Sequence, residues 1–284
     1  MISEFLSSWD LFATTYLAGW IIGLLLSVIG VFLVARNQIF VAAAVSQASA
    51  LGVAVALIAA GTMQSFIQAD PHELLGPVLA AIFSCAAALF TMGSRSAGRE
   101  SPEALTGWVY LSAASLAIIL LSKSPHGLDE INRLFSSSIV GATEREIVIF
   151  AVFTILTIAA VAVFRHRLIL LAMDPLAAAA SGMRTRLYEF AIALWIGLAV
   201  GLSIRAAGVL FTFGCLILPA LAAKALGRRI APLFFTAPVI CLVAAAISFV
   251  MANHLDIPPG QMAVAVLCVS VLIAWAVRLV CKRF

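Results

Sequence analysis

Long apolar runs, separated by short polar stretches, dominate the pattern along this chain. A helix needs about 20 apolar residues to cross the hydrocarbon core of a bilayer. The runs show no alternation of polar and apolar residues, so closed β-barrels are excluded and helical spans are favoured. The pattern therefore predicts an all-α integral membrane protein, a polytopic bundle of about nine transmembrane helices. The predicted spans are residues 12–34, 39–60, 77–93, 105–122, 146–164, 187–204, 207–226, 232–251 and 261–280.

Composition agrees with this pattern and excludes a soluble enzyme. Hydrophobic residues make up 64% of the 284 positions, and charged residues make up 11%. A soluble domain carries about 25% charged residues. With so few charges, most of the protein surface must face lipid. The chain contains no soluble domain, low-complexity tract or long linker.

The distribution of Lys and Arg predicts the orientation. If the N-terminus lies outside, 13 of the 17 basic residues fall in the inside loops. Basic residues concentrate in cytoplasmic loops of membrane proteins. We therefore expect an N-out, C-in topology with an odd number of spans.

Two polar stretches contain helix-forming patterns and are therefore more than simple connectors. In the inside stretch 165–186, Asp174 is suited to cap a helix that begins at Pro175, continues through alanines and ends at Gly182. This pattern predicts a short helix at about 174–183 on the cytoplasmic face, where it would contact a partner. The outside stretch 123–146 has a semi-apolar middle that predicts a re-entrant or interfacial helix.

The second span combines small and polar residues. Ala44, Ala48, Gly52 and Ala56 recur every four residues, which allows close helix packing. Three polar residues interrupt the same span, namely Ser46, Gln47 and Ser49. Polar groups in hydrocarbon need partners, so these residues either form interhelical hydrogen bonds or line a pathway.

Motifs for chemistry are scarce. No GxxxxGK[ST] phosphate loop and no hydrolase motif is present, so any ATPase must be another chain. His254 and Asp256 form only a weak metal pair, and a rigid turn at this IPPG sequence is the favoured interpretation. The cysteines, none of them in a CxxC pair, are expected to be small buried hydrophobes.

Four stretches carry more specific motifs. The first, Ala206–Leu226, has Gly208, a Leu-rich run, Pro219 and a small-residue cluster. The second is the segment from Asp174 to Gly182. The others are Ser248, Asp256, Pro258 and Gly260 near the C-terminus, and Arg36 with Ser46 and Gly52. Together they resemble the permease subunits of the zinc/manganese/iron ABC importers, and the resemblance covers nearly the whole chain.

This resemblance implies a function and a set of partners. Residues 1–284 would form a single ABC transporter permease domain in the bacterial inner membrane, importing zinc, manganese or iron. The chain would bind no cofactor, because ATP is used by separate cytoplasmic ABC ATPase subunits. A solute-binding protein would deliver the cargo, and a second permease copy would complete a homodimer or heterodimer. Asp174, Ala178 and Gly182 would couple ATPase motion to the spans.

One position pair departs from the family pattern. Family members typically carry Asp-x-x-x-His on span two, and the matching positions here are Ala43 and Gln47. The metal ligands are therefore left unassigned, while Ser46 and Gln47 remain the predicted path residues. The departure favours an alternative in which the same ABC fold carries a metal chelate or another small solute. An ion-coupled secondary transporter is a further alternative, which would need buried ionisable residues that the spans lack.

Overall fold

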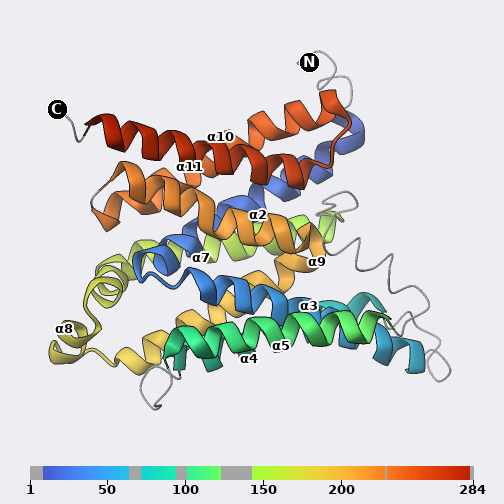
Figure 1. Ribbon diagram of the computed structural model, residues 1–284, viewed down its shortest axis with the longest axis horizontal. Helices are drawn as coiled ribbons and strands as arrows, with labels where there is room; N and C mark the ends of the chain where they lie inside the picture. The colour runs from blue at the N-terminus through green and yellow to red at the C-terminus, as the bar shows by residue number, and fades with distance from the viewer. Residues whose placement is uncertain (1–8, 64–71, 94–100, 123–142, 228, 282–284) are drawn as a thin grey trace. The chain divides into compact units, whose positions relative to one another are not determined.

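Helices account for all the regular structure that the computed structural model describes, which covers residues 9–63, 72–93, 101–122, 143–227 and 229–281 (Figure 1). Eight of the helices are long and apolar enough to cross a membrane. The prediction of an all-helical polytopic protein is confirmed. In chain order the helices are α2 (Trp9–Ala35), α3 (Ile39–Met63), α4 (His72–Gly93), α5 (Pro102–Ser122), α7 (Glu144–Met173), α8 (Pro175–Ala180), α9 (Thr185–Leu226), α10 (Ile230–Leu255) and α11 (Pro259–Cys281).

Helix α9 contains two predicted spans, 187–204 and 207–226. The eight long helices therefore hold the nine predicted segments, two of which lie on either side of a kink in α9. The break between them falls at Gly208, with φ 78° and ψ 168°, two residues beyond the connector expected at 205–206. Positive φ is nearly free of strain only for glycine, so the break falls on this residue.

Helix α7 runs nine residues beyond the predicted end of its span at residue 164. It begins at a capping box in which the Glu146 amide donates to Thr143 Oγ1 at 3.3 Å and the Thr143 amide donates to Glu146 Oε2 at 2.9 Å. Its 30 residues span about 45 Å, more than the roughly 30 Å hydrocarbon core. Apolar content predicts only the part of a helix that is embedded in lipid. The backbone hydrogen bonds of α7 continue beyond this part, so the helix is longer than the predicted span.

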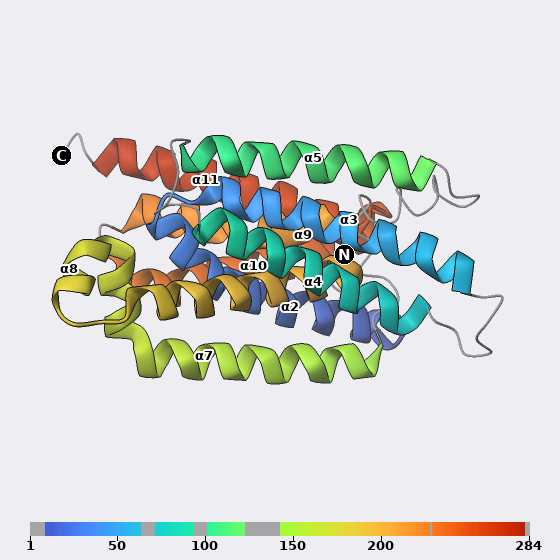
Figure 2. The same cartoon turned by 90° about the horizontal axis from the view of Figure 1, so that it is seen from below.

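The chain divides into two compact units. Unit 1 comprises residues 1–39, 136–185 and 210–284. Within it, α2 packs against α7 and α10, and α10 packs against α11 (Figure 1, Figure 2). Helix α2 and the later part of α9 make backbone contact, because a Cβ on Gly30 would lie 1.6 Å from the Leu216 carbonyl oxygen. Only glycine fits at this contact.

Unit 2 comprises residues 40–135 and 186–209. Its helices also approach through glycines: a Cβ on Gly52 of α3 would lie 2.5 Å from the Leu79 carbonyl oxygen of α4. Cβ atoms on Gly197 and Gly201 of α9 would lie 2.5 and 2.7 Å from the Cα atoms of Cys85 and Ala81. Helix α4 therefore touches both α3 and the first part of α9, and the predicted close packing of span two is confirmed.

The predicted helix in stretch 123–146 falls largely on residues 123–142, which lie outside the described residues. The prediction that residues 1–284 form a single permease domain stays a prediction.

Candidate functional site

The polar segment of α3, which consists of Ser46, Gln47 and Ser49, is buried. Ser46 is 1% exposed, Ser49 is fully buried, and Gln47 is 8% exposed. The rest of α3 is almost entirely apolar. These three side chains therefore carry most of the polar chemistry in this span.

The side-chain oxygens of this segment are unpaired among the described residues. Ser46 Oγ, Gln47 Oε1 and Ser49 Oγ have no hydrogen-bond partner among the residues that the structure describes. A buried polar atom without a partner costs about 1–3 kcal/mol, and such atoms in native proteins call for water, an ion or a ligand. The absence of interhelical hydrogen bonds favours the pathway interpretation of Ser46 and Gln47, which stays a prediction.

Elsewhere in unit 2 a buried hydroxyl is well paired. Ser84 Oγ of α4 donates to the Gly197 carbonyl oxygen of α9 at 2.6 Å and lies 3.0 Å from the Ala81 carbonyl oxygen. The interior of this unit can therefore satisfy a serine, so burial in this unit does not by itself leave a hydroxyl unpaired.

Sequence reasoning missed one further hydroxyl in unit 2. Ser203 of α9 is fully buried, and its Oγ has no partner within the described part of the chain. A single serine in an apolar span usually bonds to a carbonyl of its own helix, so its position in the sequence gave no signal.

Ala43 and Gln47 lie one turn apart on α3. Ala43 is half-buried and offers no ligand atom, while Gln47 offers a neutral amide oxygen. Across the described residues, no group of three or more His, Cys, Asp or Glu side chains is placed to hold a metal ion. Any cation that passes α3 would therefore meet neutral oxygens, without a carboxylate or an imidazole from these two positions.

The predicted short helix is present as α8. Asp174 Oδ1 accepts from the amides of Leu176 and Ala177 at 2.9 and 3.0 Å, and Pro175 is the first helical residue. The helix ends at Ala180 with Ser181 as its cap, and Gly182 follows with φ 80°. These caps form locally, as the sequence predicts.

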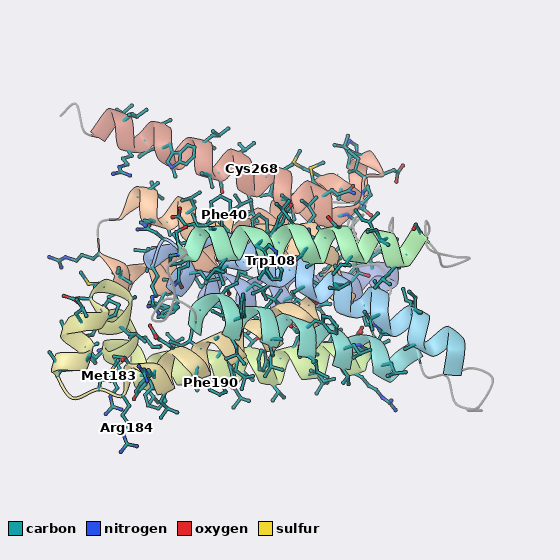
Figure 3. All side chains as sticks on the ribbon, turned by 60° about the horizontal axis from the view of Figure 1, so that its bottom comes forward. Phe40, Trp108, Met183, Arg184, Phe190 and Cys268 are labelled. Carbon is teal, nitrogen blue, oxygen red and sulfur yellow. The ribbon has the colours of Figure 1, made fainter. Side chains whose placement is uncertain are left out.

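Helix α8 has an inner and an outer side. Ala178 is fully buried, so it holds α8 against the protein and does not itself present a docking surface. Leu176 is 82% exposed and Met173 is 69% exposed. Met183 and Arg184 follow the helix (Figure 3), and Arg184 is exposed. An exposed apolar patch beside a cation is suited to contact another protein.

The remaining motif residues occupy structural positions. Asp256 caps the end of α10 in the left-handed conformation, with φ 52°, and Pro258 and Gly260 lie at the following start of α11. Pro219 is buried inside α9. The rigid turn expected near Asp256 is present.

Apolar helices with an unsatisfied polar segment inside, together with a capped surface helix, define a polytopic membrane transport protein. The chain belongs to the ABC 3 transport family, whose family model matches residues 8–278. It is the membrane permease of a bacterial ABC transporter, which works with separate ATPase subunits and a binding protein.

Curated relatives and a solved structure are similar over most of the chain. A "Probable metal transport system membrane protein" of Thermotoga maritima is 26% identical over 91% of this chain and 87% of its own length. "Manganese transport system membrane protein MntC" of Listeria innocua is 25% identical over 89% of this chain and 86% of its own length. PsaBC from Streptococcus pneumoniae, solved with a Fab, has a TM-score of 0.80 at 18% identity, covering 97% of this chain and 95% of that chain, and has the same fold.

Proposed function

We propose that this chain is the permease of an ATP-driven importer for a divalent transition metal, manganese or zinc. The relatives from Thermotoga maritima and Listeria innocua are named for metal and manganese transport. The structural observation that carries the proposal is the α3 polar segment, because its buried oxygens have no partner within the described residues. A cargo with its hydration water supplies the partners that these oxygens lack.

The cation passes α3 with little direct coordination. Gln47 Oε1 and the hydroxyls of Ser46 and Ser49 are neutral oxygen donors, and neutral oxygens bind a divalent ion weakly. Carbonyl and water oxygens suit Mn²⁺ better than Zn²⁺, which prefers imidazole or thiolate. Weak binding also serves transport, because an ion that binds too tightly does not leave the path.

Helix α8 transmits the motion of the ATPase. In the proposed N-out, C-in orientation, α8 lies on the cytoplasmic side, where Leu176 and Met173 dock into an ATPase subunit. Asp174 and Gly182 fix the two ends of α8, and Ala178 anchors it to the protein. ATP is used only by the partner subunits, and a second permease copy, identical or not, completes the path.

A second candidate keeps this architecture and changes the cargo to a metal chelate or another small solute. The observation that favours it is the pair Ala43 and Gln47, which supplies no charged ligand. A chelated ion brings its own ligands and needs only a neutral path.

The test is metal-dependent ATP hydrolysis. The permease is reconstituted with its ATPase and binding protein, and Mn²⁺, Zn²⁺ and Fe²⁺ are added in turn. Stimulation by one metal-loaded binding protein supports the importer. An ATPase that associates without stimulation by any free metal indicates the chelate cargo. A permease that transports with no ATPase at all overturns both proposals in favour of an ion-coupled transporter.

A double variant tests the role of α3 directly. Ala43→Asp with Gln47→His introduces a carboxylate and an imidazole one turn apart. If α3 lines the metal path, these ligands make the path retain Zn²⁺ and slow its transport relative to Mn²⁺, since imidazole suits Zn²⁺. The matched control moves the same pair one residue along, Ala44→Asp with Ala48→His, onto the packed face, where it should damage folding without changing metal preference.

A further inference from the structure

Two buried thiols face each other in unit 1. Cys215 of α9 and Cys241 of α10 are each 1% exposed. Their sulfur atoms lie beside the same residue of α2, Gly23. The Cys241 thiol also donates to the Gly23 carbonyl oxygen of α2 at 3.4 Å.

Because Gly23 has no side chain, both sulfur atoms can lie beside it. A Cβ on this residue would lie 3.1 Å from Cys241 Sγ and 3.9 Å from Cys215 Sγ. Both sulfurs therefore converge on one point beside α2, although they come from two other helices. Three helices contribute to this place, and each holds its atom in a buried, close-packed position.

The surroundings of the pair are uncharged. The sequence has no Asp, Glu, Lys, Arg or His in stretch 12–35 of α2, 210–223 of α9 or 230–253 of α10. The same holds for stretch 147–164 of α7, which packs against α2. An ion bound here must therefore be neutralised by the thiolates themselves, because an uncompensated charge in a buried site is strongly unfavourable.

Charge and ligand number select the class of ion. Two thiolates neutralise a divalent cation completely, while a monovalent cation would leave a net negative charge. Zn²⁺ prefers four ligands, and the described residues provide no third Cys, His, Asp or Glu at this place. A soft divalent ion that is satisfied by two sulfurs in a line fits both conditions, and Hg²⁺ is the simplest member of that class.

We propose that Cys215 and Cys241 form a binding site for a two-coordinate, thiophilic divalent cation. The neutral complex HgCl₂ delivers the ion: two Hg–S bonds form, two Hg–Cl bonds break, and two chloride ions and two protons are released. The bridge links α9 to α10 beside Gly23 of α2 and stops transport by fixing these helices. The pair belongs to unit 1, while Ser46 and Gln47 belong to unit 2.

The experiment uses the full-length permease, reduced beforehand and purified in lipid nanodiscs. Cys85, Cys268 and Cys281 are replaced by alanine, so that only the pair remains. Titration with HgCl₂ should saturate at one ion per chain, consume both free thiols and release two protons per ion. Uptake of two ions per chain, one on each sulfur, would overturn the bridge.

Single variants provide the matched controls. Adding Cys215→Ala or Cys241→Ala leaves one thiol, which binds through a single Hg–S bond and releases one proton. Competing glutathione should remove this ion at an about 100-fold lower concentration than from the pair, because the second sulfur of a bridge binds intramolecularly. Equal resistance to glutathione in the pair and in the single variants contradicts the proposal.

A transport assay distinguishes inhibition at the Cys215–Cys241 pair from damage by mercury elsewhere in the protein. Treatment with HgCl₂ should stop transport by the pair-only protein and spare the variant that lacks all five cysteines. Thermal unfolding of the pair-only protein should shift upward when the ion binds, because only the folded state holds the two sulfurs together. An unchanged unfolding temperature at full occupancy would show that the ion sits on a mobile thiol, against the proposal.

Discussion

The α3 polar segment and the contact between α2 and α9 both contain polar atoms, which lack partners in the first region and are paired in the second. In the α2–α9 junction, formed by Gly30, Val34 and Asn37 with Leu216 and Lys224, polar atoms are paired. Lys224 Nζ donates to the Val34 carbonyl oxygen at 2.9 Å and to Asn37 Oδ1 at 2.8 Å. In the α3 segment, Ser46 Oγ, Gln47 Oε1 and Ser49 Oγ have no partner in the described structure.

This difference indicates which polar atoms of the chain contribute to its stability. The Lys224 cation at the end of α2 adds a second hydrogen bond to the Val34 carbonyl oxygen and complements the helix dipole. Unpaired oxygens inside α3 weaken the fold and are tolerated only where they serve another purpose. We therefore propose that the junction is a structural contact and that the α3 segment is a functional one.

The largest expected effect is on the junction at Gly30. Gly30→Ala places a Cβ 1.6 Å from the Leu216 carbonyl oxygen, so the backbones of α2 and α9 must move apart. We expect a loss of about 3 kcal/mol in the free energy of unfolding, the upper range for overpacking. Denaturant unfolding in detergent measures this loss.

Gly107→Ala in α5 is the matched control, because a Cβ there has no neighbour within 4 Å among the described residues. It should keep or raise stability, since alanine favours the helix by up to about 1 kcal/mol. If both alanine variants unfold at the same denaturant concentration, the close contact at Gly30 does not support the fold.

The next effect concerns the cation of the junction. Lys224→Met removes both of its hydrogen bonds and leaves the Val34 carbonyl oxygen with only the bond from the Asn37 amide. The expected loss is about 2 kcal/mol, the range for hydrogen bonds to a charged group. Thermal unfolding reports the loss, while transport per folded molecule should stay unchanged. Arg229→Met removes an exposed cation nearby in sequence and should change stability by less than about 0.5 kcal/mol. A larger loss of stability in Arg229→Met than in Lys224→Met would contradict the stabilising role of Lys224.

Features that depend on nearby residues could be predicted from sequence. The caps of α8 are one example, since Asp174 bonds to amides two and three residues away. The embedded parts of the long helices are another, because apolar length alone decides them. The family resemblance, confirmed by the match over residues 8–278, rested on motifs of the same local kind.

Features that depend on distant residues could not be predicted. Lys224 contacts a residue 190 positions away, and nothing local marks it as different from other basic residues. Ser84 is paired and Ser46 is not, but the sequence cannot distinguish them, because both are serines in apolar spans. Gly208 was recognised as a motif residue, yet its positive φ, and so the position of the break in α9, depends on the fold.

A smaller effect on stability is expected in α8, which adds a third region to the comparison. Gly182→Val forces a β-branched residue to φ 80°, at a cost of roughly 1–2 kcal/mol that acts on the end of α8. A Cβ there meets no described atom within 4 Å, so the core of unit 1 should remain intact.

If α8 couples the permease to the ATPase, Gly182→Val should allow ATP hydrolysis but abolish transport. The control is Gly182→Asn, because asparagine tolerates the left-handed conformation, and it should retain coupled transport. Full transport by the valine variant would remove α8 from the mechanism, while failure of both variants to associate with the ATPase would assign α8 to docking alone.

The smallest effect on stability, and the sharpest test of the comparison, is expected at Gln47. Because Gln47 Oε1 has no partner in the described structure, Gln47→Ala breaks no known hydrogen bond of that oxygen. The free energy of unfolding should change by less than about 0.5 kcal/mol. Transport should nevertheless fall about tenfold, equivalent to roughly 1.4 kcal/mol in the barrier to the cation.

Ser84→Ala is the opposite case in the same unit. It removes a 2.6 Å hydrogen bond to the Gly197 carbonyl oxygen, so stability should fall by about 1 kcal/mol while transport per folded molecule is preserved. Metal uptake and thermal unfolding are measured on both variants. The two measurements show whether each residue contributes to transport or to stability. If Gln47→Ala loses stability and keeps transport, the α3 segment is a packing element and the two regions no longer differ. If Gln47→Ala lowers only transport and Ser84→Ala lowers only stability, unpaired polar atoms identify the transport path in this permease, and paired ones identify its scaffold.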